Sequence, residues 1–211
     1  MTKAKILIIT GDGGECYETL YAYHRFEEAR YKPVLAARAR RGLNLVIHDF
    51  EPGWDTYIER PGYRMDAEIA FTEVSVRDYS AVLIIGGRAP EYLRNDPVVL
   101  RIVREFSDQG KFVFAICHGI QILVAAGLAS GRRLTCYEHV RLEVETQGGI
   151  YSDVSSIRDG NFVSARTWQD HPAFFRDIFT CLEGGEGDSL VENLSRRAES
   201  EAVNGIGYDH G

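Results

Sequence analysis

Continuous apolar runs alternate with amphipathic segments along most of the chain. Runs built almost entirely from Val, Ile, Leu, Ala and Phe are typical of strands buried on both faces of a parallel sheet. They predict four buried strands, at residues 5–10, 32–37, 80–85 and 111–116, and three shorter strands, at 133–136, 150–157 and 162–165. The segments between them predict helices at residues 16–30, 96–110, 120–126 and 171–182.

The helix at residues 96–110 carries the most complete set of signals. Asp96 is a suitable N-cap, Pro97 fits the first turn, and Gly110 follows the last turn. Between these ends, apolar residues recur at helical spacing, at Val99, Ile102, Val103 and Phe106. This pattern predicts a helix that packs one apolar face against the sheet.

The order of the elements predicts the fold class. Alternating strands and helices indicate an α/β domain with a doubly wound, mostly parallel sheet and helices on both faces. Ligands of such sheets bind outside the carboxyl ends of the strands. Glycine-containing loops at residues 11–14, 86–87 and 117–119 follow three of these ends. We therefore expect the three loops to meet at one crevice.

Two segments fall outside the regular alternation. Residues 40–66 are aromatic and contain turn signals at Pro52-Gly53 and Pro61-Gly62, which predicts a flap or hairpin that helps to shape the pocket. Residues 184–211 are polar and rich in Gly, Glu and Ser. We expect residues 1–183 to form one domain and residues 184–211 a flexible tail.

Composition narrows the possible partners and cofactors. The net charge of -7 argues against a nucleic-acid or membrane-surface partner, because phosphate groups would be repelled. The four cysteines form no C-x-x-C pair, so neither zinc spacing nor a disulfide framework is predicted. The first apolar run is too short for a signal peptide or a membrane span. We expect a cytoplasmic protein that needs no metal or other cofactor.

Cys117 is the strongest candidate for chemistry. It stands between a buried strand and an apolar helix, where a strained turn holds a side chain up into the crevice, as in the nucleophile elbow. The positive end of the following helix is expected to favour the thiolate. The alternative is a buried cysteine that acts only as a small apolar residue.

Several segments resemble one known superfamily. The segment AICHGIQIL at residues 115–123 is similar to the nucleophile motif of the ThiJ/PfpI superfamily. Two further segments resemble its PfpI branch: IGGRAPE at residues 85–91 and YAYHR at residues 21–25. Two others look closest to plant glyoxalase-III-like members: IHDFE at residues 47–51 and TWQDHP at residues 167–172. The resemblance covers residues 5–182. It implies a flavodoxin-like fold, as in class I glutamine amidotransferases, with Cys117 as the nucleophile.

The resemblance also implies a carboxyl group beside the sulfur. The family supplies it from the first helix, and Glu18 matches that position, with Glu15 as a nearby spare. Desolvation and a neighbouring like charge should raise the pKa of such a carboxyl group, so that it can shuttle a proton. The alternative for Glu18 is an exposed helix glutamate.

Other site residues follow from the same resemblance. Protease-like members use the histidine at the position of His118 as a base, completed by the glutamate at the position of Glu91 from a neighbouring subunit. We expect a homodimer or higher homo-oligomer, and an oxyanion hole at Gly86-Gly87 built from the backbone N–H groups of Gly87 and His118. Adjacent side chains tend to diverge at a sharp turn, so the His118 ring is expected to face away from the substrate. Tyr137 matches a tyrosine that lines the pocket; a buried strand-end tyrosine is the alternative.

The remaining histidines are not assigned to catalysis. His171-Pro172 resembles part of the amidotransferase His-Pro-Glu pattern, but residue 173 is Ala, so the carboxylate partner is missing. His24 and His48 lack metal-ligand spacing, and both are expected to be structural.

These observations favour a glutathione-independent glyoxalase of the glyoxalase III type. Its Cys117 thiolate would attack methylglyoxal or glyoxal to form a hemithioacetal, which rearranges and hydrolyses to a 2-hydroxy acid. One alternative is a cysteine peptidase or amidase that uses Cys117, His118 and Glu91. Another is a redox-sensing chaperone or deglycase in which Cys117 is oxidised or reacts with glycated groups.

Overall fold

A seven-stranded sheet forms the centre of the computed structural model, which describes residues 3–184. The strand order is β10-β11-β7-β6-β1-β2-β5. All neighbours run parallel except β10 and β11, which pair antiparallel at one edge. The predicted mostly parallel sheet is therefore confirmed. The strands are β1 (Lys5–Ile9), β2 (Lys32–Ala37), β5 (Ile69–Ala70), β6 (Ala81–Ile84), β7 (Phe112–Ile116), β10 (Ser156–Asp159) and β11 (Phe162–Ala165).

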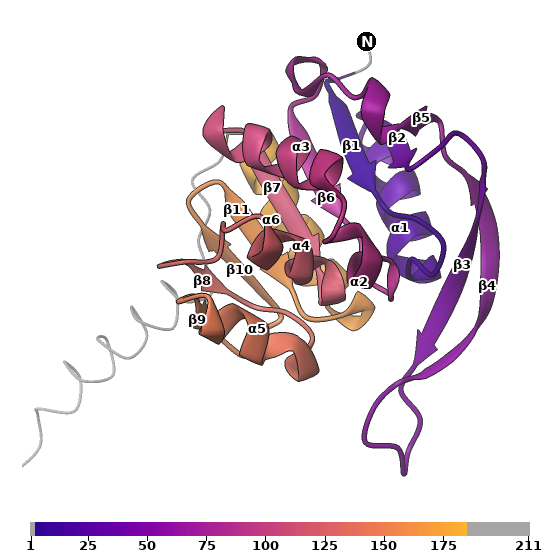
Figure 1. Cartoon of the computed structure of the whole chain (residues 1–211), viewed down its shortest axis with the longest axis vertical. Helices are drawn as coiled ribbons and strands as arrows, with labels where there is room; N and C mark the ends of the chain where they lie inside the picture. Colours follow the sequence, from indigo (N-terminus) through magenta and orange to yellow (C-terminus); the bar gives the residue numbers. More distant parts are fainter. Residues whose placement is uncertain (1–2, 185–211) are drawn as a thin grey trace, which may run out of the picture.

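Helices cover both faces of the sheet, as expected of a doubly wound, flavodoxin-like fold. In the view of Figure 1, α3 (Pro97–Asp108) and α4 (Ile120–Ala125) lie in front of the sheet, and α1 (Cys16–Glu28) and α6 (His171–Leu182) lie behind it. The two rear helices touch each other, because the rings of Phe26 and Phe175 lie 5.6 Å apart. Two predictions for α3 are confirmed. Asp96 is its N-cap, because its side chain accepts a hydrogen bond from the Val98 N–H at 3.0 Å, and the predicted apolar face is fully buried.

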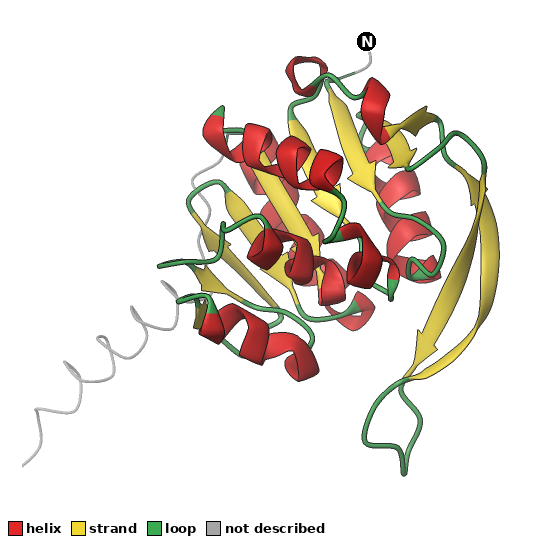
Figure 2. Ribbon diagram, in the orientation of Figure 1, coloured by secondary structure: helices red, strands yellow, loops and turns green. Residues whose placement is uncertain are grey.

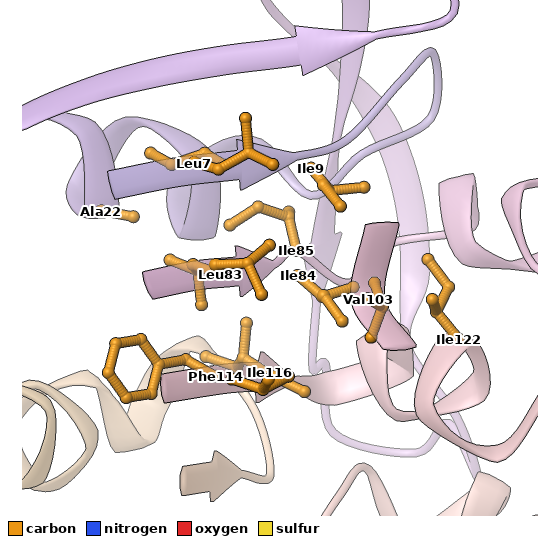
Figure 3. Close-up of a cluster of buried hydrophobic side chains, with 14 of the residues drawn as sticks. Leu7, Ile9, Ala22, Leu83, Ile84, Ile85, Val103, Phe114, Ile116 and Ile122 are labelled. Carbon is orange, nitrogen blue, oxygen red and sulfur yellow. The ribbon is translucent and has the colours of Figure 1, made fainter. Parts of the chain in front are cut away.

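The apolar strands explain why this architecture is stable. With helices on both sides, successive side chains of a central strand are all buried, so Leu7, Leu83 and Phe114 have no exposed surface. Figure 3 shows these side chains on β1, β6 and β7, with Val103 and Ile122 from the helices beside them. Full burial of one such side chain contributes roughly 1.5–3 kcal/mol. The rigid sheet that results holds the strand ends in fixed positions.

The hairpin expected within residues 40–66 is present. It consists of β3 (Gly42–Asp49) and β4 (Ile58–Asp66), and Figure 2 shows it along one side of the molecule with its connecting loop beyond the sheet. Several hydrogen bonds attach β3 to the body; among them, the Val46 N–H donates to the Gly14 carbonyl at 2.9 Å, and the Trp168 indole N–H donates to the His48 carbonyl at 2.9 Å. The hairpin therefore lies beside the loop that follows β1.

Some predicted elements differ from the structure. The single strand expected at residues 150–157 is wrong, because residues 152–155, three of which are polar, interrupt it. Its first part, β9 (Ile150–Tyr151), pairs with β8 (Arg133–Leu134) in a separate small sheet, and only β10 joins the central sheet. The short helices α2 (Ala89–Leu93) and α5 (Arg141–Thr146) were not predicted, since five or six residues are too few for a periodic pattern. Single 3₁₀ turns cover Phe71–Glu73, Val76–Asp78, Cys117–Gly119, Glu138–Val140 and Trp168–Asp170.

The predicted tail at residues 184–211 lies outside the described residues apart from Gly184. Between residues 3 and 184, no helix combines the length and the apolar character that crossing a membrane requires.

Candidate active site

The three glycine-containing loops meet at the carboxyl ends of β1, β6 and β7. The Arg88 N–H donates to the Gly13 carbonyl at 2.8 Å, and the Glu15 N–H donates to the Gly86 carbonyl at 3.3 Å. Gly14 and Gly87 form an isolated antiparallel bridge. The expected convergence on one location is therefore present, and Cys117 from the third loop lies at its centre.

Cys117 adopts the strained geometry expected of an elbow. Its φ is 58°, in the left-handed region that residues other than glycine rarely occupy. Such a conformation costs on the order of 1–3 kcal/mol and persists only where surrounding structure holds it. Here β7 ends at Ile116 and a 3₁₀ turn over Cys117–Gly119 leads into α4. The side chain is 4% exposed.

Gly86 lies between the thiol and a carboxyl group. A Cβ atom at this position would be 2.6 Å from the Cys117 Cβ and 2.8 Å from Glu18 Oε2. Those distances are far shorter than normal contacts, so only glycine lets both side chains approach the same point. Glu18 and Cys117 therefore flank the same backbone unit, as the resemblance implied.

Glu18 is fixed by the loop that it faces. Its side chain is buried, and Oε2 accepts a hydrogen bond from the Gly86 N–H at 2.7 Å. Burial raises the pKa of Glu18 well above its usual value, and the charge of Glu15 adds to this rise. The expected direction is confirmed, but the like charge comes from Glu15 rather than from the sulfur. The exposed helix glutamate considered as an alternative is excluded.

The expected thiolate character of Cys117 is not supported. Burial and the charge of Glu18 raise the pKa of Cys117 well above its usual value. Hydrogen bonds from the backbone N–H groups of His118 and Gly87 oppose this rise but are outweighed. The prediction relied on the helix end alone, and it failed because desolvation of a fully buried thiol is the larger effect. The resting site therefore keeps at least one proton on the Cys117–Glu18 pair.

The His118 ring faces the sulfur, so the expected divergence of the two side chains is wrong. His118 Nδ1 lies 3.3 Å from Cys117 Sγ. The left-handed backbone at Cys117 rotates the two side chains toward the same side. Burial, followed by the charges of His48 and His139, lowers the pKa of His118 to about 4. The imidazole is thus neutral near pH 7 and a weak base.

Glu15 is the other buried carboxyl group near Cys117 and Glu18, but it accepts hydrogen bonds from backbone N–H groups. It caps α1 by accepting the Glu18 N–H at 2.6 Å, and its second oxygen accepts the His48 N–H at 3.4 Å. Burial raises the pKa of Glu15 to about 7. Its two oxygens face N–H groups of the protein, which leaves Glu18 as the carboxyl group next to the sulfur.

Aromatic side chains cover the site. The ring of Tyr137 lies 5.2 Å from that of His118, and the Tyr57 ring lies 5.7 Å from it. Burial, followed by the charge of Cys117, raises the pKa of Tyr57 to about 12. The Tyr137 hydroxyl bonds to Thr56 Oγ1 at 3.1 Å and to His139 Nδ1 at 2.9 Å. Thr56 and Tyr57 were not singled out from the sequence, because only the folding of the hairpin brings them here.

On its other side, Tyr137 lines a surface pocket of about 280 Å³. Phe50 from the hairpin loop and Arg166 from the loop after β11 also line this pocket. The Tyr137 ring lies 6.0 Å from the Phe50 ring. Tyr137 thus lines the surface pocket and also lies beside the His118 ring that contacts the sulfur.

Glu91 and His171 lie outside the buried cluster. Glu91 is exposed on α2, and its carboxylate makes no hydrogen bond with any residue from 3 to 184. His171 stacks on Tyr21 with ring centroids 4.4 Å apart, and burial lowers its pKa to about 4. It belongs to the packing between α1 and α6. Within the described part of the chain, no group of three His, Cys, Asp or Glu side chains could hold a metal ion.

Comparison with known proteins gives consistent relatives. "Protein DJ-1 homolog D" of Arabidopsis thaliana is 36% identical over 185 residues, which cover 84% of this chain and 47% of the plant protein. The chain thus spans about half the length of that relative. "Deglycase PfpI" of Pyrococcus furiosus is 34% identical over 179 residues, which cover 85% of this chain and 99% of the archaeal protein.

The solved structures agree on the fold. A ThiJ/PfpI domain protein from Brachyspira murdochii superposes with a TM-score of 0.75 at 19% identity, covering 87% of this chain and 98% of the other. The sequence model of the DJ-1/PfpI family matches residues 4–180, which include every element from β1 to most of α6. The chain therefore belongs to the DJ-1/PfpI family.

Proposed function

We propose that this chain is a glutathione-independent glyoxalase that converts methylglyoxal or glyoxal to a 2-hydroxy acid through a hemithioacetal on Cys117. One observation carries the proposal: a thiol and a carboxyl group with raised pKa values flank Gly86 in a buried site under an aromatic cover. A small dicarbonyl compound fits such an enclosure, whereas a peptide requires an open cleft.

The buried pair suits the proton movements of this reaction. Glu18 as carboxylate takes the proton of the Cys117 thiol, and the sulfur attacks the aldehyde carbon. Reprotonation of the oxygen gives the hemithioacetal. Glu18 then removes the proton from the carbon that bears sulfur, and an enediol forms. Return of a proton to the neighbouring carbon gives a thioester, and water releases the 2-hydroxy acid and the thiol. A desolvated carboxyl group has a pKa suited to both giving and taking a proton.

The backbone around the sulfur supports the first step. The backbone N–H groups of His118 and Gly87 favour the ionised form of the Cys117 sulfur and lower its pKa, against the larger effect of burial. An aldehyde oxygen that becomes negatively charged next to this sulfur lies within reach of the same donors. Fixed N–H groups in a water-excluded site stabilise such an oxyanion without reorganisation.

Deglycation is a second candidate, favoured by the name that the archaeal relative carries. The same Cys117 sulfur would attack the carbon of a dicarbonyl adduct on an amine or thiol and release that group. A peptidase is less well supported. His118 is neutral and weakly basic, Glu91 of the same chain makes no hydrogen bond to it, and the rings of Tyr57 and Tyr137 lie beside His118.

The test is a substrate panel on the wild type and on Cys117→Ser, purified in parallel. The proposal expects lactate from methylglyoxal without glutathione, and no lactate from Cys117→Ser, whose thermal unfolding midpoint should be unchanged. Release of amine from a glycated N-acetyl amino acid, measured with free methylglyoxal scavenged, would favour the deglycase. Cleavage of a fluorogenic peptide without lactate formation would favour the peptidase.

A further inference from the structure

The hydrolytic half of the proposed reaction also needs a base, and this inference rests on the proposed function. Glu18 serves the proton that moves between the two carbons and is a carboxylate again once the thioester has formed, but a second group in the same cluster can divide the work by serving the water. A thioester in a water-excluded site reacts with water only if a neighbouring group accepts a proton from that water. His118 is poorly suited, since burial and two neighbouring histidines all lower its pKa.

His48 is the neighbour of His118, the residue whose ring contacts the sulfur. It is on β3 and 2% exposed, although the sequence suggested only a structural role. Its ring lies 6.3 Å from the His118 ring, and His118 Nδ1 is in contact with Cys117 Sγ. The ring stacks on Tyr57, with centroids 3.8 Å apart. His48 therefore belongs to the same cluster of rings as Tyr57 and His118, and it neighbours the imidazole that contacts the sulfur.

The hydrogen bonds of His48 determine which of its nitrogens is free. Nε2 lies 3.1 Å from Glu59 Oε2. Partial burial raises the pKa of Glu59, but hydrogen bonds from His48 and Arg88 outweigh this and lower its pKa overall. Glu59 is thus an ionised acceptor, and Nε2 carries the proton. Nδ1 then presents a lone pair, and it is buried with no hydrogen-bond partner among residues 3–184.

Glu59 is itself held in place by the catalytic loop. Arg88 Nε donates to both carboxylate oxygens of Glu59, at 3.0 and 2.9 Å. Arg88 directly follows Gly87, whose backbone N–H favours the ionised form of the Cys117 sulfur. The carboxylate–imidazole pair has the arrangement of the orienting pair in hydrolytic triads, with the acid fixing the tautomer and the ring orientation.

Glu59 also distinguishes His48 from His118 in basicity. The pKa of His48 is lowered overall, mainly by burial and in part by the charge of Arg88, but the Glu59 carboxylate opposes this effect through its hydrogen bond and its charge. None of the influences on His118 opposes its burial. Of the two imidazoles in the enclosure, His48 is the one that a carboxylate supports as a base.

We propose that His48, oriented by Glu59, is the general base that activates the water for hydrolysis of the Cys117 thioester. One water proton moves to His48 Nδ1 as the water oxygen bonds to the thioester carbon. The tetrahedral intermediate then collapses, the carbon–sulfur bond breaks with its electron pair on Cys117, and the proton on His48 passes to the thiolate. Atoms and charges balance with water as the only co-reactant. His48 contacts the reacting water, whereas Glu59 and Arg88 are positioning residues.

The experiment separates the two halves of the reaction. Wild type, His48→Gln and Glu59→Gln are mixed with methylglyoxal, quenched in acid and analysed by intact-protein mass spectrometry, and lactate is measured in parallel. His48→Gln should lower steady-state lactate formation by about 10²–10⁴-fold, as expected for loss of a general base. Because the steps before hydrolysis remain intact, an adduct with the mass of one methylglyoxal should accumulate on Cys117. Hydroxylamine added to the desalted adduct should release it as a hydroxamate, which identifies a thioester.

Each outcome decides one point. His24 is exposed on α1, so His24→Gln is the matched control and should show wild-type lactate formation and no adduct. Glu59→Gln keeps the imidazole of His48 but no longer fixes its tautomer. It should accumulate the same adduct, with a smaller decrease in lactate formation than His48→Gln. It also tests the proposal if His48→Gln does not fold. Wild-type turnover in both variants, or loss of turnover without a thioester, would overturn the role of His48. Absence of both lactate and adduct in the wild type would instead refute the proposed function.

Discussion

Gly86→Ala adds one methyl group at the point where Cys117 and Glu18 come together. The new Cβ would lie 2.6 Å from the Cys117 Cβ and 2.8 Å from Glu18 Oε2. Carbon atoms in favourable contact are about 3.5–4.0 Å apart, so the thiol side chain has to move by roughly 1 Å. Both neighbouring side chains are buried, so neither can move out into solvent.

The magnitude follows from this displacement. Overpacking of a buried position costs about 1–3 kcal/mol of stability. A misplacement of about 1 Å at the reacting atoms costs on the order of 10²-fold in rate. We therefore expect kcat/KM for methylglyoxal to fall about 100-fold, with a modest decrease in the thermal unfolding midpoint.

Two measurements check this reasoning. Lactate formation reports the rate, and the rate of Cys117 alkylation by iodoacetamide, followed by mass spectrometry, reports the thiol without assuming a substrate. Gly127→Ala is the control, because a Cβ there meets no atom within 4 Å, although its φ of 74° also disfavours alanine. Wild-type kcat/KM and alkylation in Gly86→Ala would refute the account of the buried pair.

Three further predictions test the assignment of roles. Glu18→Gln keeps an acceptor for the Gly86 N–H and should lower methylglyoxal turnover by about 10²–10⁴-fold, with His118→Ala lowering it much less; the reverse order would make the histidine the base. Light scattering should show a homo-oligomer, and a fully active monomer would exclude a role for Glu91 in the site of a neighbouring subunit. Glu91→Ala should affect glyoxalase activity only slightly. Burial raises the pKa of Glu15 to about 7 from 4.5, so the folded chain keeps a proton that the unfolded chain loses. The free energy of unfolding should therefore fall more steeply between about pH 4.5 and 7 in wild type than in Glu15→Gln. Urea denaturation at several pH values measures it, and the same pH dependence in both proteins would contradict this prediction.

The fold could be predicted because its signals are local. Strands such as β1 and β6 are continuous apolar runs, and α3 carries its own cap and stripe. The location of the site followed from a general property of parallel sheets, that loops at the carboxyl ends of neighbouring strands lie together. Both inferences need only residues close together in the sequence and the order of the elements.

The protonation state and the cover of the site could not be predicted in this way. The pKa of Cys117 depends on burial and on Glu18, which comes from a different element. It is raised, whereas the helix that follows Cys117 had predicted a lowered pKa. The orientation of the His118 ring depends on one positive φ angle. The placement of His48 and Tyr57 depends on a hairpin that folds back onto the loop after β1. His48 lies in the IHDFE segment, which indicates the family but not this placement, and Tyr57 lies in none of the segments singled out from the sequence.

The aromatic cover also bears on which substrates can react. Access for a bulky substrate requires the hairpin loop to move away, which breaks the hydrogen bond between Thr56 and Tyr137 and separates Tyr57 from His118 and Tyr137. A hydrogen bond contributes about 0.5–1.5 kcal/mol and an aromatic contact a similar amount, so opening costs roughly 2–4 kcal/mol. At about 1.4 kcal/mol for each factor of ten, the open form is disfavoured by roughly 30- to 700-fold. A peptide or a glycated protein has to overcome this cost before it reaches Cys117. The proposed glyoxalase reaction therefore predicts that a free dicarbonyl compound reacts faster than the same group on a peptide, and that the difference arises from the closed hairpin.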